Sequence, residues 1–351
     1  MDNLQKYGYT ESEHGKPPEG LAPARVTAVH KGRFELASNR GVHFGRLKAG
    51  AYYGNELAIF PTVGDFVLTT EEESGDCLIV KTLPRRSSFA RLDPDPSGGR
   101  EQAVAANFDY VFIMSSLNQD FNLNRIERYL ILTRSSGAVP VVILTKADLA
   151  PDAEMSVQLV QAIAGDAEVI PVSSRDGTGL ERLIKYTATG KTVVFLGMSG
   201  VGKSTLTNAL MGADVMEVSE IREDDARGRH TTTHRQMSML PSGAMVIDTP
   251  GMRSIGMWDA DEGLSETFTD VEELMSSCRF SDCRHESEPG CAINEALEDG
   301  RLTKARFERY HALKRESDFA KKKADYMRLK QERFKSISKY HRAQNKSSGM
   351  K

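Results

Sequence analysis

The feature that most constrains the fold is a glycine-rich segment at residues 197–205, Gly-Met-Ser-Gly-Val-Gly-Lys-Ser-Thr. It matches the pattern G-x-x-x-x-G-K-[ST] and follows an apolar run at 192–196 that predicts a buried strand. Backbone N–H groups in such a loop point at phosphate oxygens, and the helix that follows adds its positive dipole end. A chance glycine-rich turn would lack this context. The pattern predicts an α/β P-loop domain in which Lys203 reaches the β- and γ-phosphates and Ser204 binds Mg²⁺.

The whole loop is expected to contact the nucleotide. The candidate residues are Gly197, Ser199, Gly200, Val201, Gly202, Lys203, Ser204 and Thr205. Further along, residues 245–251 predict a strand ending in D-x-x-G, where Asp248 can hold Mg²⁺ through water and the Gly251 N–H can face the γ-phosphate.

Residues 228–233, Gly-Arg-His-Thr-Thr-Thr, lie between these two motifs. They can supply a hydroxyl to Mg²⁺ and close over the nucleotide as a switch. The candidate hydroxyls are those of Thr231, Thr232 and Thr233. Taken alone, this stretch also fits a solvated loop.

A base-reading motif lies upstream of the phosphate loop. Residues 141–148 form an apolar run followed by T-K-x-D, and the next predicted strand ends at Ser173 and Ser174, which matches the guanine-reading elements of GTPases. In that interpretation Asp148 accepts hydrogen bonds from guanine, the Lys146 stem covers the base and the serine backbone faces O6. An adenine would leave the carboxylate unpaired, so the motif predicts GTP rather than ATP. A strand that ends in ordinary polar residues is the alternative.

Conventional GTPases place these base-reading elements after D-x-x-G, whereas here they come first. Because domain termini usually lie close together, a circular permutation can preserve the same sheet and site. We therefore predict a circularly permuted GTPase domain over residues 107–262. Its strands are expected at 110–114, 139–144, 169–172, 192–196 and 244–247, and its helices include 124–135 and 153–164.

The part of the chain before this domain predicts a small β-barrel at residues 21–86. After a polar leader, 1–20, five β-rich runs follow at 24–30, 33–36, 41–44, 65–70 and 77–82. An OB-fold and an SH3-like barrel fit this strand count equally well, and the OB-fold is the more common nucleic-acid binder. Residues 87–106, rich in Pro, Gly, Ser and charge, predict a linker.

Three cysteines and a histidine are crowded together within residues 278–291. Cys278, Cys283, His285 and Cys291 give four ligands of the type that tetrahedral zinc prefers, with no position left for water. We expect one structural Zn²⁺ in a small α-rich module, 263–300, whose folding is coupled to the metal. Reduced cysteines also indicate a cytoplasmic protein. Unrelated thiols near a histidine are the alternative.

Charge is distributed unevenly along the 351 residues. The net charge is -3, but residues 301–351 carry 17 Lys or Arg against 5 Asp or Glu. This basic tail predicts one or two helices that contact a phosphate backbone, although a solvated helix packed on the zinc module is also open. We find neither a signal peptide nor 18 consecutive apolar residues, and we expect a monomer with no membrane partner.

The permuted motifs and the spacing C-x4-C-x-H-x5-C resemble those of the RsgA (YjeQ/YloQ) family of circularly permuted GTPases, over residues 20–300 and beyond. The resemblance implies a GTP-hydrolysing factor, GTP to GDP plus phosphate. It also implies binding to the small (30S) ribosomal subunit and its rRNA, late subunit maturation and ribosome-dependent activity. The alternative is a free regulatory GTPase whose barrel and zinc module bind proteins.

Two positions depart from related motifs. Thr145 stands where the family has the Asn of N-K-x-D, which ties the base loop to the phosphate loop; the change bears on nucleotide affinity but not on guanine choice. Met252 stands where Ras-like GTPases carry the glutamine that orients water, and a thioether cannot do this. His230, within the family's G-R-H-T-T-T, is the candidate catalytic residue with Lys203, although it can also be a surface histidine.

Overall fold

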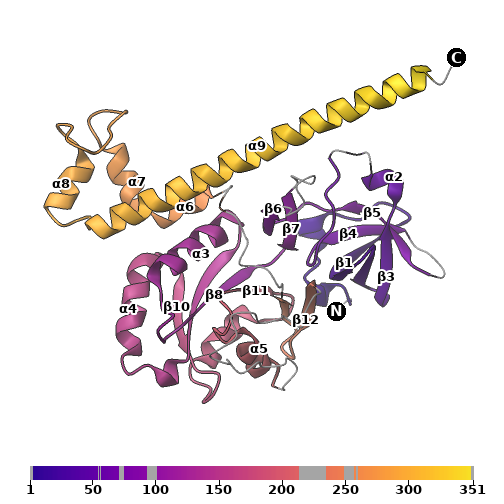
Figure 1. Ribbon diagram of the computed structural model, residues 1–351. Helices are drawn as coiled ribbons and strands as arrows, with labels where there is room; N and C mark the ends of the chain where they lie inside the picture. The colour runs from indigo at the N-terminus through magenta and orange to yellow at the C-terminus, as the bar shows by residue number, and fades with distance from the viewer. Residues whose placement is uncertain are drawn as a thin grey trace, which may run out of the picture. The chain divides into compact units, whose positions relative to one another are not determined.

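The computed structural model describes residues 3–53, 55, 57–70, 75–92, 101–212, 235–248, 257 and 260–348. The chain divides into two compact units (Figure 1). Unit 1 comprises Met1–Phe89 and Ala103–Ser254, and unit 2 comprises Ala90–Gln102 and Ile255–Lys351.

The first part of unit 1 is a closed five-stranded barrel. Its strands are β1 (Leu21–His30), β2 (Arg33–Ser38), β3 (Gly41–Leu47), β4 (Phe66–Thr70) and β5 (Cys77–Thr82), with the short helix α2 (Ala49–Tyr52) between β3 and β4. The strand order is β1-β2-β3-β5-β4, and β4 pairs back onto β1 to close the barrel. The sequence left an OB-fold and an SH3-like barrel open, and the parallel pairing of β3 with β5 fits the OB-fold.

The leader belongs to the packing of unit 1. It contains the short helices η1 (Gln5–Tyr7) and α1 (Glu11–His14). Leu4 and Tyr9 are buried in a cluster with Phe66 of the barrel. Two isolated apolar residues in a polar segment give no periodic signal, so the sequence did not show that this leader is anchored.

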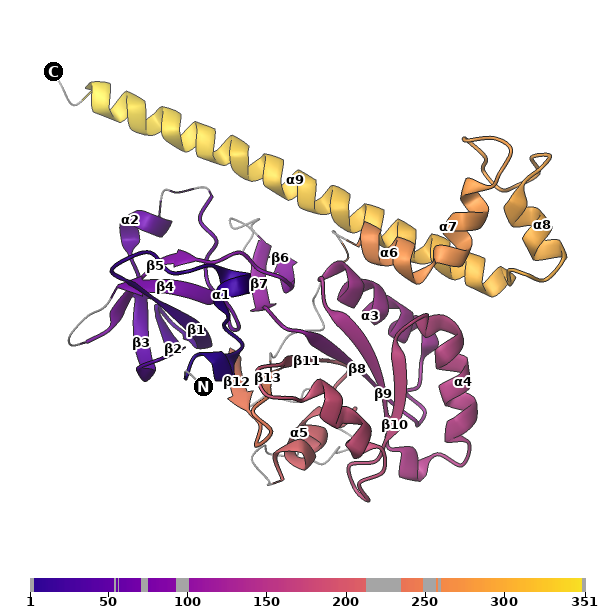
Figure 2. The ribbon, with the colours of Figure 1, turned by 180° about the vertical axis from the view of Figure 1, so that it is seen from behind.

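The remainder of unit 1 is an α/β domain (Figure 2). Its strands are β8 (Tyr110–Ser116), β9 (Val139–Thr145), β10 (Glu168–Val172), β11 (Thr192–Leu196), β12 (Arg235–Met239) and β13 (Met245–Asp248). Its helices are α3 (Leu123–Ser135), α4 (Ala153–Ala164), α5 (Lys203–Met211) and the 3-10 segments η2 (Ala147–Leu149) and η3 (Leu180–Tyr186).

The sheet order in this domain is β10-β9-β8-β11-β13-β12. The first five strands are parallel and β12 is antiparallel to β13. Helices α3 and α4 cover one face and α5 the other (Figure 2). The core between α5 and the sheet is built from apolar residues such as Phe112, Val193 and Leu206, as expected for parallel strands buried on both faces.

The segment 87–106, expected to be a linker, is partly ordered. Strands β6 (Ser88–Leu92) and β7 (Glu101–Ala106) form a two-stranded sheet of their own, and residues 93–100 lie outside the described residues. The ring of Phe89 is buried and stacks on Phe108 at 4.8 Å. These buried side chains order the ends of a segment whose Pro, Gly and Ser content predicted a linker.

The carboxyl-terminal part of unit 2, from Ile255 onward, is helical in its described residues, in agreement with the sequence. It contains α6 (Asp261–Thr267), α7 (Thr269–Ser276), α8 (Ala292–Glu298) and the 45-residue helix α9 (Lys304–Ser348). No helix among the described residues is sufficiently long and apolar to cross a membrane.

The first turns of α9 pack on the other helices of unit 2. The Tyr310 ring is fully buried against Phe268, and its hydroxyl donates to Glu272 over 2.6 Å. Ser317 donates to the carbonyl of Met257. Residues 301–317 therefore belong to the zinc module rather than to a separate tail, because the helix has an apolar edge that the other helices cover.

Candidate functional site

The predicted nucleotide motifs meet at one edge of the sheet. The base-reading segment follows β9, the serines follow β10, the phosphate loop follows β11 and Asp248 ends β13. These four strands are parallel, and the carboxyl ends of parallel strands share an edge, where open α/β sheets bind ligands. The permuted order of the motifs leaves this arrangement unchanged.

The phosphate loop adopts a backbone that requires glycine. Gly200 and Gly202 have φ of 74° and 97°, a region that other residues rarely adopt. A Cβ on Gly197 would lie 2.8 Å from the Met114 carbonyl oxygen. Helix α5 begins at Lys203, whose ammonium donates to the carbonyls of Gly197 and Met198 over 2.9 and 2.6 Å. The lysine therefore lies over the loop, and the loop ends at a helix N-terminus suited to phosphate.

Thr145 connects the base-reading segment to the phosphate loop. It is the last residue of β9 and is only 4% exposed. Its hydroxyl donates to the carbonyl oxygen of Val201 over 2.7 Å. A threonine hydroxyl therefore joins the two loops that the family's asparagine is expected to join.

The residues after Thr145 turn sharply toward solvent. Lys146 has φ of 61°, and Asp148 lies exposed in η2. After β10, Ser173 is fully buried, and its hydroxyl accepts hydrogen bonds from the N–H groups of Arg175 and Asp176. The hydroxyl thus holds the turn that presents Ser174, which is half-buried.

The predicted switch segment and the end of D-x-x-G belong to the part of the chain that is not described. His230, Gly251 and Met252 lie outside the described residues, as do Thr231, Thr232 and Thr233. The backbone of Asp248 is described and pairs with Gln236 of β12. The structure therefore gives the position of the strand that ends in Asp248, and the assigned roles of the others stay predictions.

Cys278, Cys283, His285 and Cys291 converge on one point of unit 2. Their ligand atoms all lie within 4.8 Å of one another. The Nδ1 of His285 lies 3.6 Å from the Cys278 sulfur and 3.5 Å from the Cys291 sulfur. A tetrahedral ion with bonds of about 2.3 Å to sulfur and about 2.1 Å to nitrogen needs an S···N edge of about 3.6 Å. The donor set therefore fits a four-coordinate metal ion.

Local structure holds these ligands in place. Cys291 caps α8, and its sulfur accepts from the N–H of Asn294. The Glu288 carboxylate accepts from the N–H groups of Arg284, Glu286 and Ser287, and these backbone hydrogen bonds lower its pKa to about 2. The loop between His285 and Cys291 is therefore organised around one ionised carboxylate.

The sequence did not reveal a second layer around the metal cluster. The Phe307 ring of α9 meets His285 edge to face at 6.0 Å and His311 at 4.4 Å. Phe307 and His311 line a surface groove of unit 2, together with Lys304 and Arg315. The spacing of Phe307 and His311, one helical turn apart, was the available signal, but it is also typical of ordinary helix packing.

Comparison with known proteins agrees with this geometry. The sequence profile described as RsgA GTPase matches residues 82–258, from the end of the barrel through D-x-x-G. The chain belongs to the RsgA GTPase family. The motif order, the barrel and the Cys/His cluster expected from the sequence all accord with this membership.

Relatives within the RsgA family align over most of the chain. A protein of Listeria innocua named Small ribosomal subunit biogenesis GTPase RsgA 1 is 43% identical over 339 residues, 96% of each chain. A Methanosarcina acetivorans protein named Small ribosomal subunit biogenesis GTPase RsgA is 46% identical over 281 residues, 79% of this chain and 76% of its own.

Two solved structures share the fold. The crystal structure of YjeQ from Thermotoga maritima is 26% identical, with a TM-score of 0.63 over 85% of this chain and 98% of its own. That of YloQ, described as a circularly permuted GTPase, is 23% identical, with a TM-score of 0.59 over 86% of this chain and 98% of its own. The predicted fold class, with its circularly permuted GTPase domain, is thereby confirmed.

Proposed function

We propose that this RsgA family GTPase binds the small ribosomal subunit and its rRNA, assists late maturation of that subunit, and hydrolyses GTP faster when bound to it. The observation that carries the proposal is the 43% identity to the Listeria innocua relative over 96% of both chains. An alignment of that extent includes the barrel, the GTPase domain and the Cys/His module, so the relative's role applies to the chain as a whole.

The nucleotide is held along the carboxyl edge of the sheet. The residues assigned to GTP and GDP are Thr145, Lys146, Asp148, Ser173, Ser174, Gly251 and the phosphate-loop residues from 197 to 205 already named. Asp148 selects guanine, and its exposure at the end of β9 leaves it accessible to the base. Lys203 exchanges its two loop carbonyls for phosphate oxygens, which accept stronger, charge-assisted hydrogen bonds.

Two metal ions belong to the proposed function, Mg²⁺ at the nucleotide site and Zn²⁺ in unit 2. Mg²⁺ arrives with GTP and is held by Ser204, by a switch threonine and, through water, by Asp248; when bound it neutralises phosphate charge. One Zn²⁺ is held by the Cys₃His cluster, and the match of its S···N separations to a tetrahedral edge supports that metal. His230 is the residue assigned to the attacking water, because Met252 cannot orient it.

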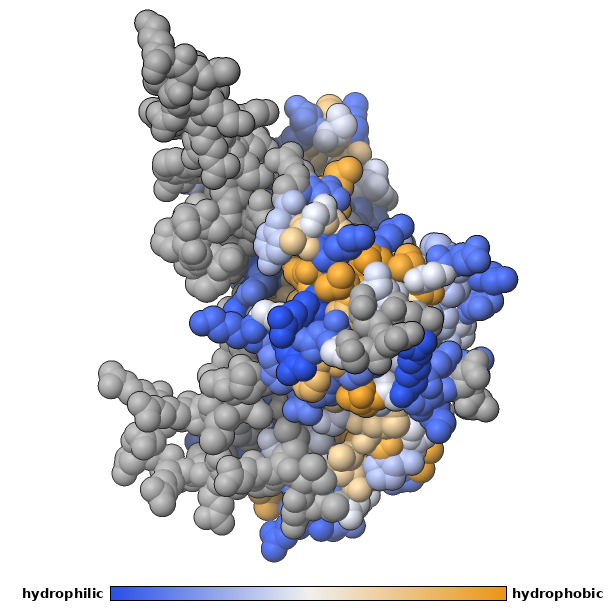
Figure 3. All heavy atoms as spheres, turned by 90° about the vertical axis from the view of Figure 1, so that its right-hand side faces the viewer, coloured by the Kyte–Doolittle hydropathy of each residue, from blue (hydrophilic) through white to orange (hydrophobic). Residues whose placement is uncertain are grey.

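Surface chemistry in both units supports an RNA partner. On the barrel, the segment between α2 and β4 exposes Tyr53, Leu57 and Phe60 at 66%, 91% and 39%, and Figure 3 shows apolar surface among hydrophilic residues on that side. Exposed aromatic rings stack on unpaired bases. In unit 2, Lys304 and Arg315 flank the Phe307 groove, which Glu308 also lines.

The distal part of α9, together with the three residues that follow it in sequence, supplies the largest excess of positive charge. Residues 323–351 contain nine Lys or Arg against two Asp or Glu. Within the part of α9 that the structure describes, Phe319 and Tyr326 are 71% and 65% exposed. A basic helix with exposed aromatic rings suits rRNA better than a solvated surface. We assign the protein to the cytoplasm as a monomer with no membrane partner.

Co-sedimentation tests the binding part of the proposal. The full chain is centrifuged through a sucrose gradient with purified small subunits, in the presence of GDP or of a non-hydrolysable GTP analogue. We expect it to travel with the small subunit in the GTP-analogue state and to dissociate with GDP, while purified large subunits retain it in neither state. Failure to bind small subunits in either state would favour the free regulatory GTPase.

A further inference from the structure

Strand β12 is shared between the barrel and the nucleotide site. On one side, its backbone at Gln236 is paired with Ala28 of β1, a barrel strand. On the other side, the same residue is paired with Asp248 of β13. The barrel is therefore joined to the predicted Mg²⁺ ligand through the backbone of a single intervening strand.

The joint between β1 and β12 is short. Its register pairs Ala28 with Gln236 and Val29 with Arg235, whereas β1 pairs with β4 along Leu21–Arg25. A bulge interrupts β1 between Val26 and Ala28, where one edge of the strand changes its partner from β4 to β12 while the other edge stays paired with β2. Bulges bend a strand and increase its local twist, so the joint lies at the bend where β1 changes partners.

A buried arginine fixes the position of the barrel beside this joint. Arg25 of β1 is 1% exposed, and its guanidinium donates to the carbonyls of Tyr7, Gly64 and Asn107. It also lies 3.3 Å from the sulfur of Met245, the first residue of β13. Desolvation lowers the pKa of Arg25 to about 9, so the side chain is still a cation near neutral pH.

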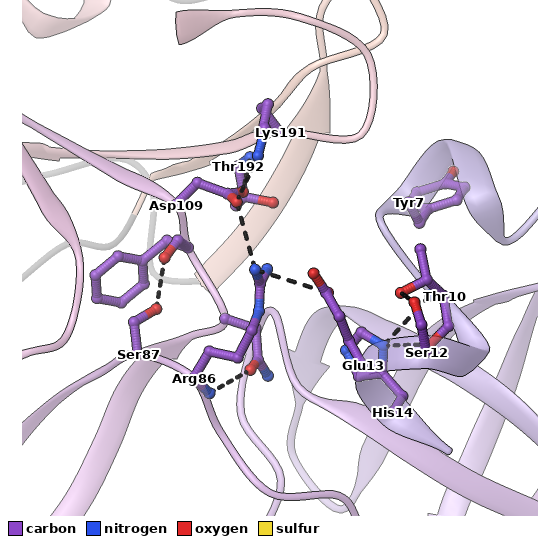
Figure 4. A network of polar contacts seen from close by, with 12 residues as sticks. Tyr7, Thr10, Ser12, Glu13, His14, Arg86, Ser87, Asp109, Lys191 and Thr192 are labelled. Atoms are coloured by element: carbon purple, nitrogen blue, oxygen red, sulfur yellow. Dashed lines mark hydrogen bonds and ion pairs between the residues drawn. The ribbon is translucent and has the colours of Figure 1, made fainter. Parts of the chain in front are cut away.

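Close backbone approach and a second polar network reinforce this position. Gly64 has φ of +92°, and a Cβ there would lie 1.9 Å from the Ala106 carbonyl oxygen. Nearby, Arg86 lies 3.6 Å from Asp109, which accepts from Lys191 and from the N–H of Thr192 (Figure 4). The barrel is thus held at the amino-terminal ends of β8 and β11, while at Gln236 it is joined through β12 to the carboxyl end of β13.

From this arrangement we infer that β12 is the link through which the barrel controls the position of Asp248. Arg25 is the positioning residue, because it fixes β1 of the barrel, with which β12 is paired. In sequence, the segment 228–233 ends two residues before β12 begins. The inference rests on the proposed function for its ligand: rRNA bound to the barrel shifts β1, and β12 carries the shift to the Mg²⁺ site.

A reversible disulfide across the joint tests the link. In the Ala28→Cys/Gln236→Cys variant, the two sulfurs face each other across paired strands, within the Cα separation that disulfides accept. We expect the oxidised protein to hydrolyse GTP alone at the rate of its reduced form. Small subunits should stimulate only the reduced form, and dithiothreitol should restore stimulation of the oxidised protein.

The matched control is a pair within the barrel hairpin, His30→Cys/Arg33→Cys, which joins β1 to β2 without touching β12. Small subunits should stimulate GTP hydrolysis by this control equally in its oxidised and reduced forms. Because the control carries the same zinc cysteines, it would reveal any effect that oxidation of those cysteines has on stimulation. Equal stimulation of the oxidised and reduced link variants would overturn the inference. If wild-type protein is not stimulated at all, the proposed function fails instead, so the two failures are distinguishable.

A second variant tests Arg25 without subunits. Arg25→Met keeps the length of the chain but removes the donors, and coupling of this kind changes equilibria by about 2- to 30-fold. We expect the Mg²⁺ concentration for half-maximal GTP hydrolysis to rise by that factor. Arg33→Met, an exposed position on β2, should leave it unchanged. If Arg25→Met folds and its Mg²⁺ requirement is unchanged, the positioning role of Arg25 is refuted. If Arg25→Met does not fold, the Ala28→Cys/Gln236→Cys variant remains the test of the inference.

Discussion

Replacing Thr145 with valine tests whether a single hydroxyl connects the base site to the phosphate loop. The two side chains have nearly the same shape, but valine cannot donate to the Val201 carbonyl, which now accepts over 2.7 Å. Because Thr145 is only 4% exposed, water cannot replace the lost donor. A buried acceptor that loses its partner costs about 1–3 kcal/mol.

The same free energy sets the expected change in nucleotide affinity. When the hydroxyl is missing, the loop is free to leave its binding conformation, and the nucleotide has to restore that conformation on binding. GDP affinity should therefore fall by about 5- to 150-fold, the range that corresponds to 1–3 kcal/mol. Guanine preference should be retained, since Asp148 is unchanged.

Titration with a fluorescent GDP analogue, together with thermal unfolding, measures both effects. Thr145→Ser retains the hydroxyl and should bind nearly as tightly as wild type. Thr133→Val removes a buried hydroxyl that donates to the Tyr129 carbonyl over 2.8 Å within α3, away from the loop. It should lose stability but keep its affinity. If Thr145→Val binds GDP as tightly as Thr133→Val does, the hydroxyl has no role in the nucleotide site.

Four further predictions follow from the site. Asp148→Asn should lower the preference for GTP over ATP, measured by competition, because the carboxylate no longer accepts from guanine; unchanged preference would exclude this residue. His230→Ala should lower the hydrolysis rate with GTP affinity unchanged, since a group that orients water acts in the transition state; equal rates would make it structural. Cys283→Ala should lose about one zinc per chain by elemental analysis, together with the protease resistance of residues 263–300, while GTP binding survives; a metal-free but resistant module would contradict this. Truncation after Lys322 should weaken subunit binding and reduce its salt slope by about 0.7 per lost phosphate contact, whereas an unchanged slope would make the tail a solvated helix.

The position of this truncation comes from the structure, because the charge pattern of the sequence indicates a different boundary. Charge alone suggested a boundary at Gly300, but Tyr310 and Ser317 lie in the packing of unit 2. Removing residue 301 onward would therefore damage the zinc module as well as the tail. A helix that is packed along its first turns and exposed further along has the same composition throughout, so composition cannot locate the change.

Local motifs were predictable because their chemistry depends on residues adjacent in sequence. The strand at Thr192–Leu196 and the start of α5 at Lys203 agree with the interpretation of the phosphate loop. Arg25 was not predictable. It lies in an alternating strand where a charged residue is typical of a solvent-facing position, and its partners Gly64, Asn107 and Met245 are distant in sequence.

The function of Thr145 lies between these two cases. Its departure from the family's asparagine was visible in the sequence, and so was the possible loss of a connection between loops. Only the structure shows that the shorter side chain reaches Val201, because that contact depends on how closely β9 and the phosphate loop approach each other.

GTP turnover measured with and without purified small ribosomal subunits tests the central claim most directly. The full chain, loaded with zinc and supplied with Mg²⁺, is assayed for phosphate release alone, with small subunits and with large subunits. We predict marked stimulation by small subunits only, and none for Lys203→Ala, which loses its positive partner for the phosphates. Equal turnover in all three conditions would contradict the account and identify a GTPase that works independently of the ribosome.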